Sequence, residues 1–250
     1  MKIAIIGYGK MGHMIEEVAL SRGHEITCVI EKAPSNSPID GERKIWSPEE
    51  GFQSEAFRRA DVAIEFTTPQ TAEENIRKSW EQGVPVVCGS TGINKPNPDP
   101  SLKGREEGNK WIVRNEKGKV MLVWSSNYSV GVNIFFELNK FLAQEMKDLT
   151  QTLSRGEGGY TPSITEIHHI HKLDKPSGTA KTLAEGLTQT LYQEEGIRVP
   201  IESIREGEVP GTHEVKWDSE EDTIIITHIA KGRRGFALGA VLAAEGLTRK

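Results

Sequence analysis

The apolar residues of the first half of the chain form short runs, and longer amphipathic segments separate them. The runs are rich in Val and Ile and have the length of buried strands. In the separating segments apolar residues recur at helical spacing, and Thr68 followed by Pro69 is typical of a helix start. Strands that alternate with helices predict βαβ units and a parallel sheet. We expect strands at 3–6, 25–31, 61–66, 84–88 and 119–124, and helices at about 10–22 and 69–82.

Two polar segments interrupt this alternation. Residues from about 31 to 54 and from about 93 to 109 are rich in proline and polar side chains. Proline lacks a backbone N–H and fixes its own φ, so it disfavours regular structure in these positions. We therefore predict both segments as surface loops.

The pattern changes after Ser129. Apolar residues between Val132 and Met146 recur at helical spacing, which predicts an amphipathic helix with Phe135 and Phe136 in a core. Strand-like runs with one helix between them follow, and they favour an α+β arrangement with a mixed or antiparallel sheet. We expect these strands near 164–170, 212–217 and 223–229, the helix at about 179–194 and a last helix at about 235–250.

These patterns predict two domains. The fold class is α/β, with an N-terminal Rossmann-like doubly wound parallel sheet followed by a C-terminal α+β domain that contains a mixed sheet. We place the first domain at 1–128 and the second at 129–234. The last helix is expected to pack back on the first domain.

Composition excludes several classes of function. The 250 residues carry 31 Lys and Arg against 36 Asp and Glu, so no broad attraction to nucleic acid or to an anionic membrane is expected. The apolar run at the N-terminus is too short for a signal peptide or a membrane span. Cys28 and Cys88 both lie in apolar runs, which favours buried, reduced thiols in a cytoplasmic protein that handles a small molecule.

A glycine motif follows the first strand directly and opens the first helix. Its sequence is Gly7-Tyr8-Gly9-Lys10-Met11-Gly12. Gly7 allows a tight turn, Gly9 lets a pyrophosphate approach the backbone, and Gly12 lets helix and strand pack closely. Glu31 ends the second strand about 20 residues further on, where an acidic side chain binds a ribose hydroxyl. The joint pattern predicts a nicotinamide dinucleotide site, and the alternative is a glycine-rich turn in some other α/β protein.

The residues at the end of the second strand bear on the choice of cofactor. Glu31 would repel the 2′-phosphate of NADP, whereas Lys32 beside it would attract that phosphate. The pair predicts use of both NADH and NADPH. The alternative for Lys32 is a solvated loop charge.

Two further loops follow strands of the predicted parallel sheet. Gly89-Ser90-Thr91-Gly92 comes after the strand at 84–88, and Glu65-Phe66-Thr67-Thr68-Pro69 ends the strand before it. Ligands of open α/β sheets lie beyond the carboxyl ends of the strands, so these loops are placed to contact the nicotinamide end of a cofactor. Each alone would be read as a turn.

A cluster of basic residues lies in the second half, and two chemistries compete for it. His168, His169, His171 and Lys172 stand close together in the sequence. Neighbouring residues of a strand point to opposite faces, so His168 and His169 cannot converge on one ion, and we predict no metal site. Protonatable groups beside an anion site fit better, because Lys is charged at neutral pH and a bound dianion favours protonated His.

The start of the following helix supplies that anion site. Ser177, Gly178 and Thr179 lead into the helix, and the N–H groups of a first helical turn have no acceptor within the helix. The alternative is that Ser177 or Thr179 only caps the helix. Together the two halves predict hydride transfer from a nicotinamide to a small anionic substrate, with a proton from Lys or His.

At these residues the chain resembles the dihydrodipicolinate reductase family, also called 4-hydroxy-tetrahydrodipicolinate reductases. The stretch from Glu166 to Ala180 is similar to the family signature E-x-H-H-x-x-K-x-D-x-P-S-G-T-A. The similarity extends to the glycine motif, to the loops after Glu65 and Gly89, to residues 125–133, and to Gly211-Thr212-His213 and Thr227-His228.

The resemblance implies a homotetrameric NADH- or NADPH-dependent reductase of the diaminopimelate and lysine pathway, with a small dicarboxylate substrate. It implies a dinucleotide-binding first domain and a second domain for substrate binding and oligomerisation. By the resemblance His168 and Lys172 are proton donors. Substrate-binding positions, including the helix-start serine, are His169, Ser177, Gly178 and Thr179. Cofactor-binding positions are Gly7, Tyr8, Gly9, Lys10, Met11, Gly12, Glu31, Lys32, Gly89, Ser90, Thr91, Ser125, Ser126, Asn127 and Tyr128.

The sequence departs from the family pattern at a few positions. Glu65 replaces the usual Asp, Ser90 replaces a Thr, Lys175 replaces the usual Ala, and the glycine loop is one residue shorter than in many members. None of these changes removes a catalytic residue type, so an active enzyme is expected. Two alternatives are a catalytically silent NAD(P)-binding sensor and a semialdehyde dehydrogenase, although the second needs a thiol nucleophile in a loop.

Overall fold

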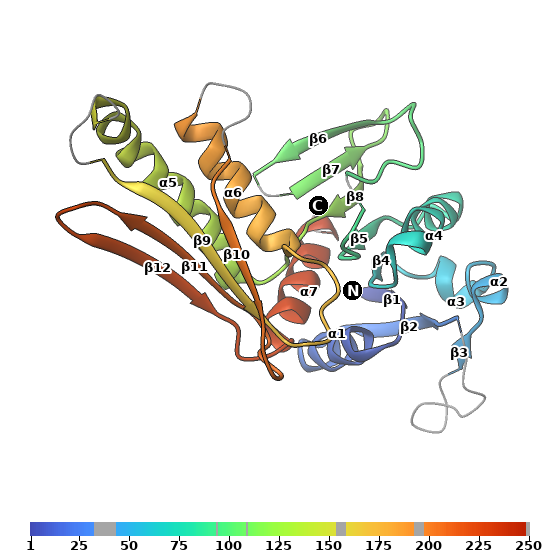
Figure 1. The fold of residues 1–250 in the computed structure, drawn as a ribbon. Helices are drawn as coiled ribbons and strands as arrows, with labels where there is room; N and C mark the ends of the chain where they lie inside the picture. Colours follow the sequence, from blue (N-terminus) through green and yellow to red (C-terminus); the bar gives the residue numbers. More distant parts are fainter. Residues whose placement is uncertain (33–43, 94, 109, 154–158, 193–197, 249–250) are drawn as a thin grey trace. The chain divides into compact units, whose positions relative to one another are not determined.

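The computed structural model describes residues 1–32, 44–93, 95–108, 110–153, 159–192 and 198–248. It forms two compact units, which Figure 1 shows as ribbons coloured along the sequence. Unit 1 contains Met1–Ser129 and Arg233–Lys250, and unit 2 contains Val130–Gly232.

Unit 1 is built on an eight-stranded sheet in the order β3-β2-β1-β4-β5-β8-β7-β6. The first six strands of this order are parallel, and β7 and β6 add an antiparallel edge. This order and direction confirm the predicted Rossmann-like sheet. The strands are β1 (Lys2–Ile6), β2 (Glu25–Ile30), β3 (Ile45–Trp46), β4 (Val62–Glu65), β5 (Val86–Cys88), β6 (Lys103–Glu107), β7 (Lys110–Arg114) and β8 (Val120–Trp124).

Helices cover both faces of this sheet because its central strands are apolar on both sides. In β1, Ile3 and Ile5 pack into one core and Ala4 and Ile6 into the other. The first core includes α1 (Lys10–Ser21) and α7 (Arg234–Thr248), and the second includes α3 (Glu55–Arg58) and α4 (Pro69–Glu81). The short α2 (Pro48–Gly51) lies beside β2. Each fully buried Ile or Val contributes about 1.5–3 kcal/mol to this packing.

The last helix, α7, packs very closely on the rest of unit 1. Ala237, Ala240, Val241 and Ala244 of α7 are fully buried in the first core. A Cβ added to Gly239 would lie 1.6 Å from the backbone oxygen of Tyr128, so only glycine permits this approach. Small residues in α7 therefore let the helix lie against the end of β8 and the segment that follows.

A charged group at the end of α7 gives a pH-dependent link to α1. Glu245 accepts hydrogen bonds from Arg22 at 2.7 and 3.0 Å and lies 2.9 Å from His24. Hydrogen bonding from Arg22, with a smaller contribution from His24, lowers the pKa of Glu245 from 4.5 to about 2. The carboxylate therefore stabilises the fold fully above pH 4.5, and this stabilisation is lost as the pH falls toward 2.

Glu245→Gln is expected to lower the melting temperature by about 2 °C at neutral pH, because a partly exposed ion pair is weak. The deficit relative to wild type should stay constant above pH 4.5 and shrink at lower pH. Thermal unfolding of the wild type and of Glu245→Gln across this pH range measures the difference in melting temperature. A deficit that does not change with pH would exclude a contribution from the charge.

The two segments predicted as loops contain regular structure, so those predictions were wrong. Strand β6 falls in the second segment, and β3 and α2 fall in the first, where residues 33–43 lie outside the described part. β6 has no apolar alternation because it is an edge strand with the sequence KGREE. Charged side chains on an edge strand prevent pairing with other chains, and they also remove the pattern that predicts a strand.

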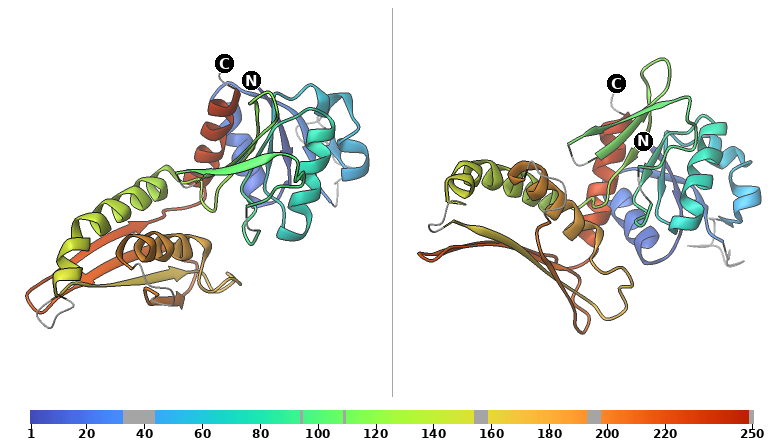
Figure 2. Two further views of the ribbon diagram at one scale, coloured as in Figure 1. Left: turned by 90° about the horizontal axis from the view of Figure 1, so that it is seen from above. Right: turned by 45° about the horizontal axis from the view of Figure 1, so that its top comes forward.

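Unit 2 is a four-stranded mixed sheet with two helices on one face, as Figure 2 shows. The order is β10-β9-β11-β12, with β10 and β9 parallel and the other pairs antiparallel. This confirms the predicted mixed sheet, although β10 was not predicted. The elements are α5 (Val130–Leu153), β9 (Thr161–His168), α6 (Gly178–Leu191), β10 (Ile201–Arg205), β11 (Thr212–Asp218) and β12 (Thr223–Ile229).

The core of unit 2 lies between this sheet and the two helices. Phe135 and Phe136 are buried here with Trp217, which confirms that the aromatic pair of α5 belongs to a core. β9 alternates buried and half-buried residues, so every second side chain faces α6. None of the helices within the described ranges is both long and apolar enough to cross a bilayer.

Candidate active site

The glycine motif forms a turn at the carboxyl end of β1. Gly7 has φ +91°, and a Cβ there would lie 2.5 Å from the backbone oxygen of Phe66. A Cβ on Gly12 would lie 2.3 Å from the backbone oxygen of Gly7. Both positions therefore require glycine, as the pattern predicts.

Gly9 has a different environment. No atom of the described residues lies within 4 Å of a Cβ built on Gly9, apart from its chain neighbours. Gly9 is also the N-cap of α1, and within the described structure no side chain caps this helix end. Open space above the N-terminus of a helix fits a pyrophosphate, so the residues present fit a dinucleotide.

Glu31 lies at the edge of this turn. Its Oε2 accepts a hydrogen bond from the backbone N–H of Tyr8 at 2.6 Å, and its Oε1 accepts one from the N–H of Lys32 at 2.8 Å. The second strand thus brings the acidic side chain next to the glycine turn, where a ribose would bind. Lys32 is exposed, and so is Lys10 of the motif.

The side chain of Tyr8 belongs to the core rather than to the open part of the turn. Tyr8 is 7% exposed, and its hydroxyl donates to Glu16. The centroid of its ring lies 3.9 Å from the ring centroid of His13. Met11 is partly buried against the same core. The side chain of Tyr8 is therefore turned into the core, and contact of Tyr8 with a cofactor stays a prediction.

In the same sheet β4 lies next to β1, and β5 lies next to β4. The backbone N–H of Gly89 donates to the oxygen of Glu65, and Ser90 Oγ accepts from the N–H of Thr67. Ser90 is buried, whereas Thr91 is exposed. The loops after both strands are therefore hydrogen-bonded to each other at the carboxyl edge, with Thr91 open to solvent.

Most side chains of the predicted cofactor segment 125–128 face inward. Ser125, Asn127 and Tyr128 are each at most 9% exposed, and Ser126 is half-buried. Ser125 Oγ donates to the oxygen of Asn127, and Tyr128 Oη lies 2.8 Å from the oxygen of Val123. These side chains hold the end of β8 in shape, and contact with a cofactor by this segment stays a prediction.

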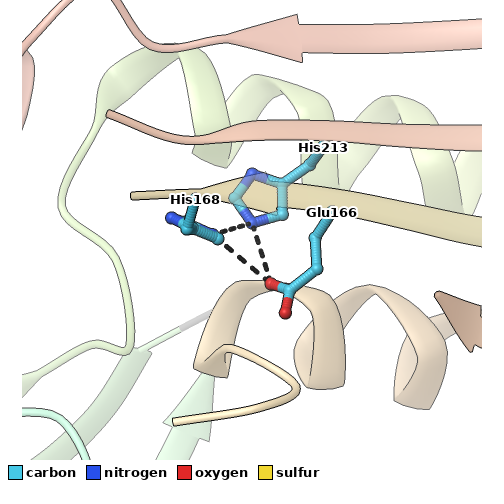
Figure 3. A group of neighbouring side chains, drawn as sticks. All are labelled: Glu166, His168 and His213. Carbon is cyan, nitrogen blue, oxygen red and sulfur yellow. Dashed lines mark hydrogen bonds and ion pairs between the residues drawn. The ribbon is translucent and has the colours of Figure 1, made fainter. Parts of the chain in front are cut away.

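In unit 2, three side chains of neighbouring strands converge between the sheet and α6. Figure 3 shows Glu166 and His168 from β9 with His213 from β11. His168 Nε2 lies 3.3 Å from Glu166 Oε2 and 3.3 Å from His213 Nε2. Glu166 and His168 share a face because they are two residues apart, and β11 pairs His213 directly with Glu166.

Glu166 joins this group to the start of α6. The backbone N–H of Ser177 donates to both of its oxygens, at 3.0 and 3.2 Å, and Arg205 of β10 donates to Oε1 at 3.1 Å. Burial acts to raise the pKa of Glu166, but hydrogen bonds from His168 and Ser177 outweigh it and lower that pKa well below its ordinary value. Glu166 is therefore a buried carboxylate, with 0% exposure.

His213 is buried and neutral. Burial, followed by the nearby imidazole of His168, lowers the pKa of His213 to about 3. Its Nε2 also lies 3.3 Å from Ser177 Oγ, which in turn accepts the N–H of Ala180 and caps α6. Ser177 therefore performs the capping role that the sequence left as an alternative, and its side chain is 2% exposed.

Lys172 lies in the segment between β9 and α6. Its Nζ is 2.6 Å from Asp174 Oδ1, and its side chain is 22% exposed. Arg205 donates to the backbone oxygens of Lys172 and Asp174, so the segment is tied to β10. Lys172 is thus an ammonium group that keeps contact with solvent.

The remaining histidines of the cluster are not part of this group. His169 and His171 lie with ring centroids 6.1 Å apart, and His171 pairs with Glu208 on the surface. His169 is half-buried and lies beyond the end of β9. The structure therefore brings His168, but not His169 or His171, to the buried group.

Three residues of this site were not predicted from the sequence as functional residues: Glu166, Arg205 and His213. Glu166 and His213 stand in segments that the family resemblance covers, which is the signal that could have found them. Arg205 had no such signal, because it lies in the strand that the sequence did not predict.

The group Glu166, His168 and His213 offers three possible metal ligands within 4.8 Å of one another. The carboxylate already faces Arg205 and the N–H of Ser177, which compensate its charge. Hydrogen bonding therefore accounts for the arrangement, and the predicted absence of a metal stays a prediction.

Neither thiol is suited to nucleophilic catalysis. Cys28 and Cys88 are both buried and free. Burial raises the pKa of Cys28 to about 11, and burial followed by the charge of Glu65 raises the pKa of Cys88 well above its ordinary value. This disfavours the semialdehyde dehydrogenase alternative, since that chemistry needs an accessible thiolate.

The glycine turn, the parallel sheet and the separate mixed-sheet unit define a two-domain oxidoreductase of the Rossmann type that takes a nicotinamide cofactor. Comparison with known proteins is more specific. Residues 1–128 match the family model "Dihydrodipicolinate reductase, N-terminus" and residues 131–250 match "Dihydrodipicolinate reductase, C-terminus". The chain belongs to the dihydrodipicolinate reductase family.

Individual relatives cover the whole chain. It is 39% identical to a 4-hydroxy-tetrahydrodipicolinate reductase of Christiangramia forsetii, over 100% of this chain and 93% of the relative. The chain is 30% identical to the enzyme of the same name from Archaeoglobus fulgidus, over 100% of this chain and 95% of the relative. A dipicolinate-bound dihydrodipicolinate reductase from Paenisporosarcina sp. TG-14 has a similar fold, with a TM-score of 0.65 and 18% identity over 99% of this chain and 94% of that one.

Proposed function

We propose that this protein reduces 4-hydroxy-tetrahydrodipicolinate to tetrahydrodipicolinate with NADH or NADPH, in diaminopimelate and lysine biosynthesis. The relatives that carry this name match the chain over its full length. The structural observation that supports the proposal most is the group in unit 2, where protonatable His168 lies beside the N-terminus of α6. Such a site suits a dicarboxylate that must also receive a proton.

The reaction takes up a hydride and a proton and releases the 4-hydroxyl group as water. When bound, the reduced nicotinamide supplies the hydride. In unit 1, Gly7, Gly9 and Gly12 shape the turn for the pyrophosphate, and Glu31 accepts from the ribose. At the carboxyl edge of the sheet, Thr91 and the backbone of Gly89, Ser90 and Tyr128 contact the nicotinamide end in this proposal.

The residues of unit 2 divide between anchoring and proton transfer. First-turn N–H groups of Gly178 and Thr179, with His169, bind the substrate carboxylates. Ser177 contributes through its backbone and by capping α6. His168 and Lys172 form the pair from which the reacting proton comes. The exposed Lys32 beside Glu31 supports use of both cofactors, because its ammonium can offset the repulsion of a 2′-phosphate.

The test is turnover of substrate made enzymatically in the assay. The purified protein is mixed with NADH or NADPH, and loss of the reduced nicotinamide absorbance is followed. We expect kcat/KM values for the two cofactors to agree within about tenfold, since Glu31 and Lys32 act in opposite directions and each is worth roughly 1 kcal/mol in water.

The same assay separates the reductase from the silent NAD(P)-binding sensor. A sensor would bind both cofactors in calorimetry and oxidise neither in the presence of substrate. Binding of dipicolinate, the ligand of the Paenisporosarcina structure, is the matched control for substrate recognition. Cofactor binding without turnover or dicarboxylate binding would contradict the proposal.

The homotetramer and the cytoplasmic location stay predictions. Ile225 and Ile229 of β12 are 52% and 65% exposed, on strand positions that alternate with the half-buried residues Ile224 and Ile226. Exposed apolar residues on a sheet support association of unit 2 with further copies. Light scattering of the purified protein measures the assembly directly.

A further inference from the structure

The two ring nitrogens of His168 have different surroundings. Nε2 faces Glu166 Oε2 and His213 Nε2, each at 3.3 Å. Figure 3 shows the other nitrogen pointing away from both residues. The edge of the ring that carries Nδ1 lies next to Gly211. A Cβ added to Gly211 would lie 2.9 Å from Cε1 of His168 and 3.2 Å from its Nδ1. Gly211, at φ +151°, thus leaves the space that this orientation of the ring needs.

The chemistry of Glu166 decides which nitrogen carries a proton. A carboxylate can only accept hydrogen bonds, so the bond to Glu166 requires a hydrogen on Nε2 of His168. Arg205 and the N–H of Ser177 stabilise the carboxylate form. Arg205 donates to Oε1, and the N–H of Ser177 donates to both oxygens, so it shares Oε2 with His168. Nδ1 is then the nitrogen that can exchange a proton with another molecule.

We propose that Glu166 and His213 are positioning residues that keep a proton on Nε2 of His168 and leave Nδ1 as the nitrogen that donates the reacting proton. This inference rests on the proposed function, in which His168 belongs to the proton-donating pair. In the step, the doubly protonated ring breaks its Nδ1–H bond and the substrate gains that proton. The ring remains neutral with hydrogen on Nε2, still bonded to Glu166, and solvent returns the proton to Nδ1.

The charges around His168 support this arrangement from each packed element. Glu166 on β9 brings a carboxylate oxygen within 3.3 Å of Nε2 of His168. His213 on β11 and His228 on β12 have lowered pKa values, to about 3 for His213, and burial is the main cause for both. Arg205 on β10 forms an ion pair with Glu166, and Lys172 forms an ion pair with Asp174. His213 therefore adds no positive charge beside His168 at neutral pH.

The decisive variant is Glu166→Gln, which keeps the shape of the side chain and removes its charge. We expect kcat at neutral pH to fall about tenfold. We also expect the alkaline limb of the pH profile of kcat to move to lower pH by about one unit, because loss of a nearby opposite charge changes the pKa of a group by about one to three units. Substrate KM and cofactor affinity should change less than about twofold, because neither ligand is expected to contact Glu166.

Two further variants separate charge from shape. His213→Gln should reduce kcat a few-fold and leave the alkaline limb in place, because neutral His213 contributes orientation and no charge. Glu202→Gln changes an exposed carboxylate on the neighbouring strand β10 and is the matched control, with unaltered kinetics. If Glu166 had only a structural role, Glu166→Gln would lower stability and kcat without moving the alkaline limb of the kcat profile.

A second measurement needs no turnover. Nitrogen-15 spectra of labelled histidine, with His168 assigned from a His168→Gln sample, report which nitrogen is protonated in the neutral ring. Hydrogen on Nε2 is expected in the wild type, and hydrogen on Nδ1 would overturn the inference even if Glu166→Gln does not fold. An unmoved alkaline limb in folded Glu166→Gln would overturn it as well. Absence of wild-type turnover with the expected spectrum would instead count against the proposed function.

Discussion

Replacing Lys172 with Ala is expected to lower kcat by about two to four orders of magnitude, the range for removal of a group that takes part in proton transfer. Lys172 holds its ammonium 2.6 Å from Asp174, with its side chain 22% exposed, so the group is both oriented and in contact with solvent. Cofactor affinity should stay within about twofold, because the residues proposed to bind the cofactor all lie in unit 1.

The substitution is not expected to disturb the fold. The backbone N–H of Lys172 donates to the oxygen of His169, and its own oxygen accepts from Arg205, and both contacts persist with Ala. Steady-state kinetics with each cofactor, together with calorimetric cofactor binding, measure the two expectations separately.

Two other lysine variants define the cause of the loss. Lys172→Arg keeps the positive charge but cannot release a proton, so it should recover substrate KM and little of kcat. Lys175→Ala removes an exposed charge three residues away and is the matched control. Wild-type kcat in Lys172→Ala would show that this ammonium has no part in the chemistry.

What the sequence predicted best is local in the chain. The positive φ at Gly7, the close approach of Gly12 to Gly7 and the cap at Ser177 each depend on residues within a few positions of one another. Their geometry follows from the conformational freedom of glycine and from the unpaired N–H groups of helix starts. Such features do not require knowledge of the tertiary structure.

The buried group of unit 2 depends instead on strand pairing. Glu166 and His213 are 47 residues apart, and they meet because β11 pairs with β9 in one particular register. A shift of one residue would turn His213 to the other face of the sheet. The register is set by the packing of the whole unit, so a single sequence does not reveal it.

The polar residues after β8 show a second limit of prediction from the sequence. Ser125, Asn127 and Tyr128 occupy a segment expected to face a ligand, yet they satisfy backbone groups inside unit 1. A polar side chain that stabilises a buried turn and one that binds a ligand have the same composition and spacing. The contacts alone distinguish the two cases.

The second large effect is expected for the glycine turn, where Gly12→Ala should weaken binding of both nicotinamide cofactors by about a hundredfold or more. The new methyl group would lie 2.3 Å from the backbone oxygen of Gly7 and 3.1 Å from its carbonyl carbon. Backbone cannot move aside as a flexible side chain can, so α1 must shift away from the end of β1. That shift misplaces the N–H groups that face the pyrophosphate, and the overpacking destabilises the fold by about 1–3 kcal/mol.

Gly9→Ala separates loss of binding from loss of stability. The space around Gly9 is open within the described structure, so its methyl group should leave the unfolding free energy nearly unchanged and still obstruct the pyrophosphate. Gly246→Ala, in the last turns of α7 and equally without neighbours within 4 Å among the described residues, is the control that should bind normally. Calorimetric binding of NADH and NADPH with urea unfolding of the three variants gives both quantities. Wild-type affinity in Gly9→Ala would place the pyrophosphate elsewhere, because a methyl group on that backbone would fill the space that the phosphates must occupy.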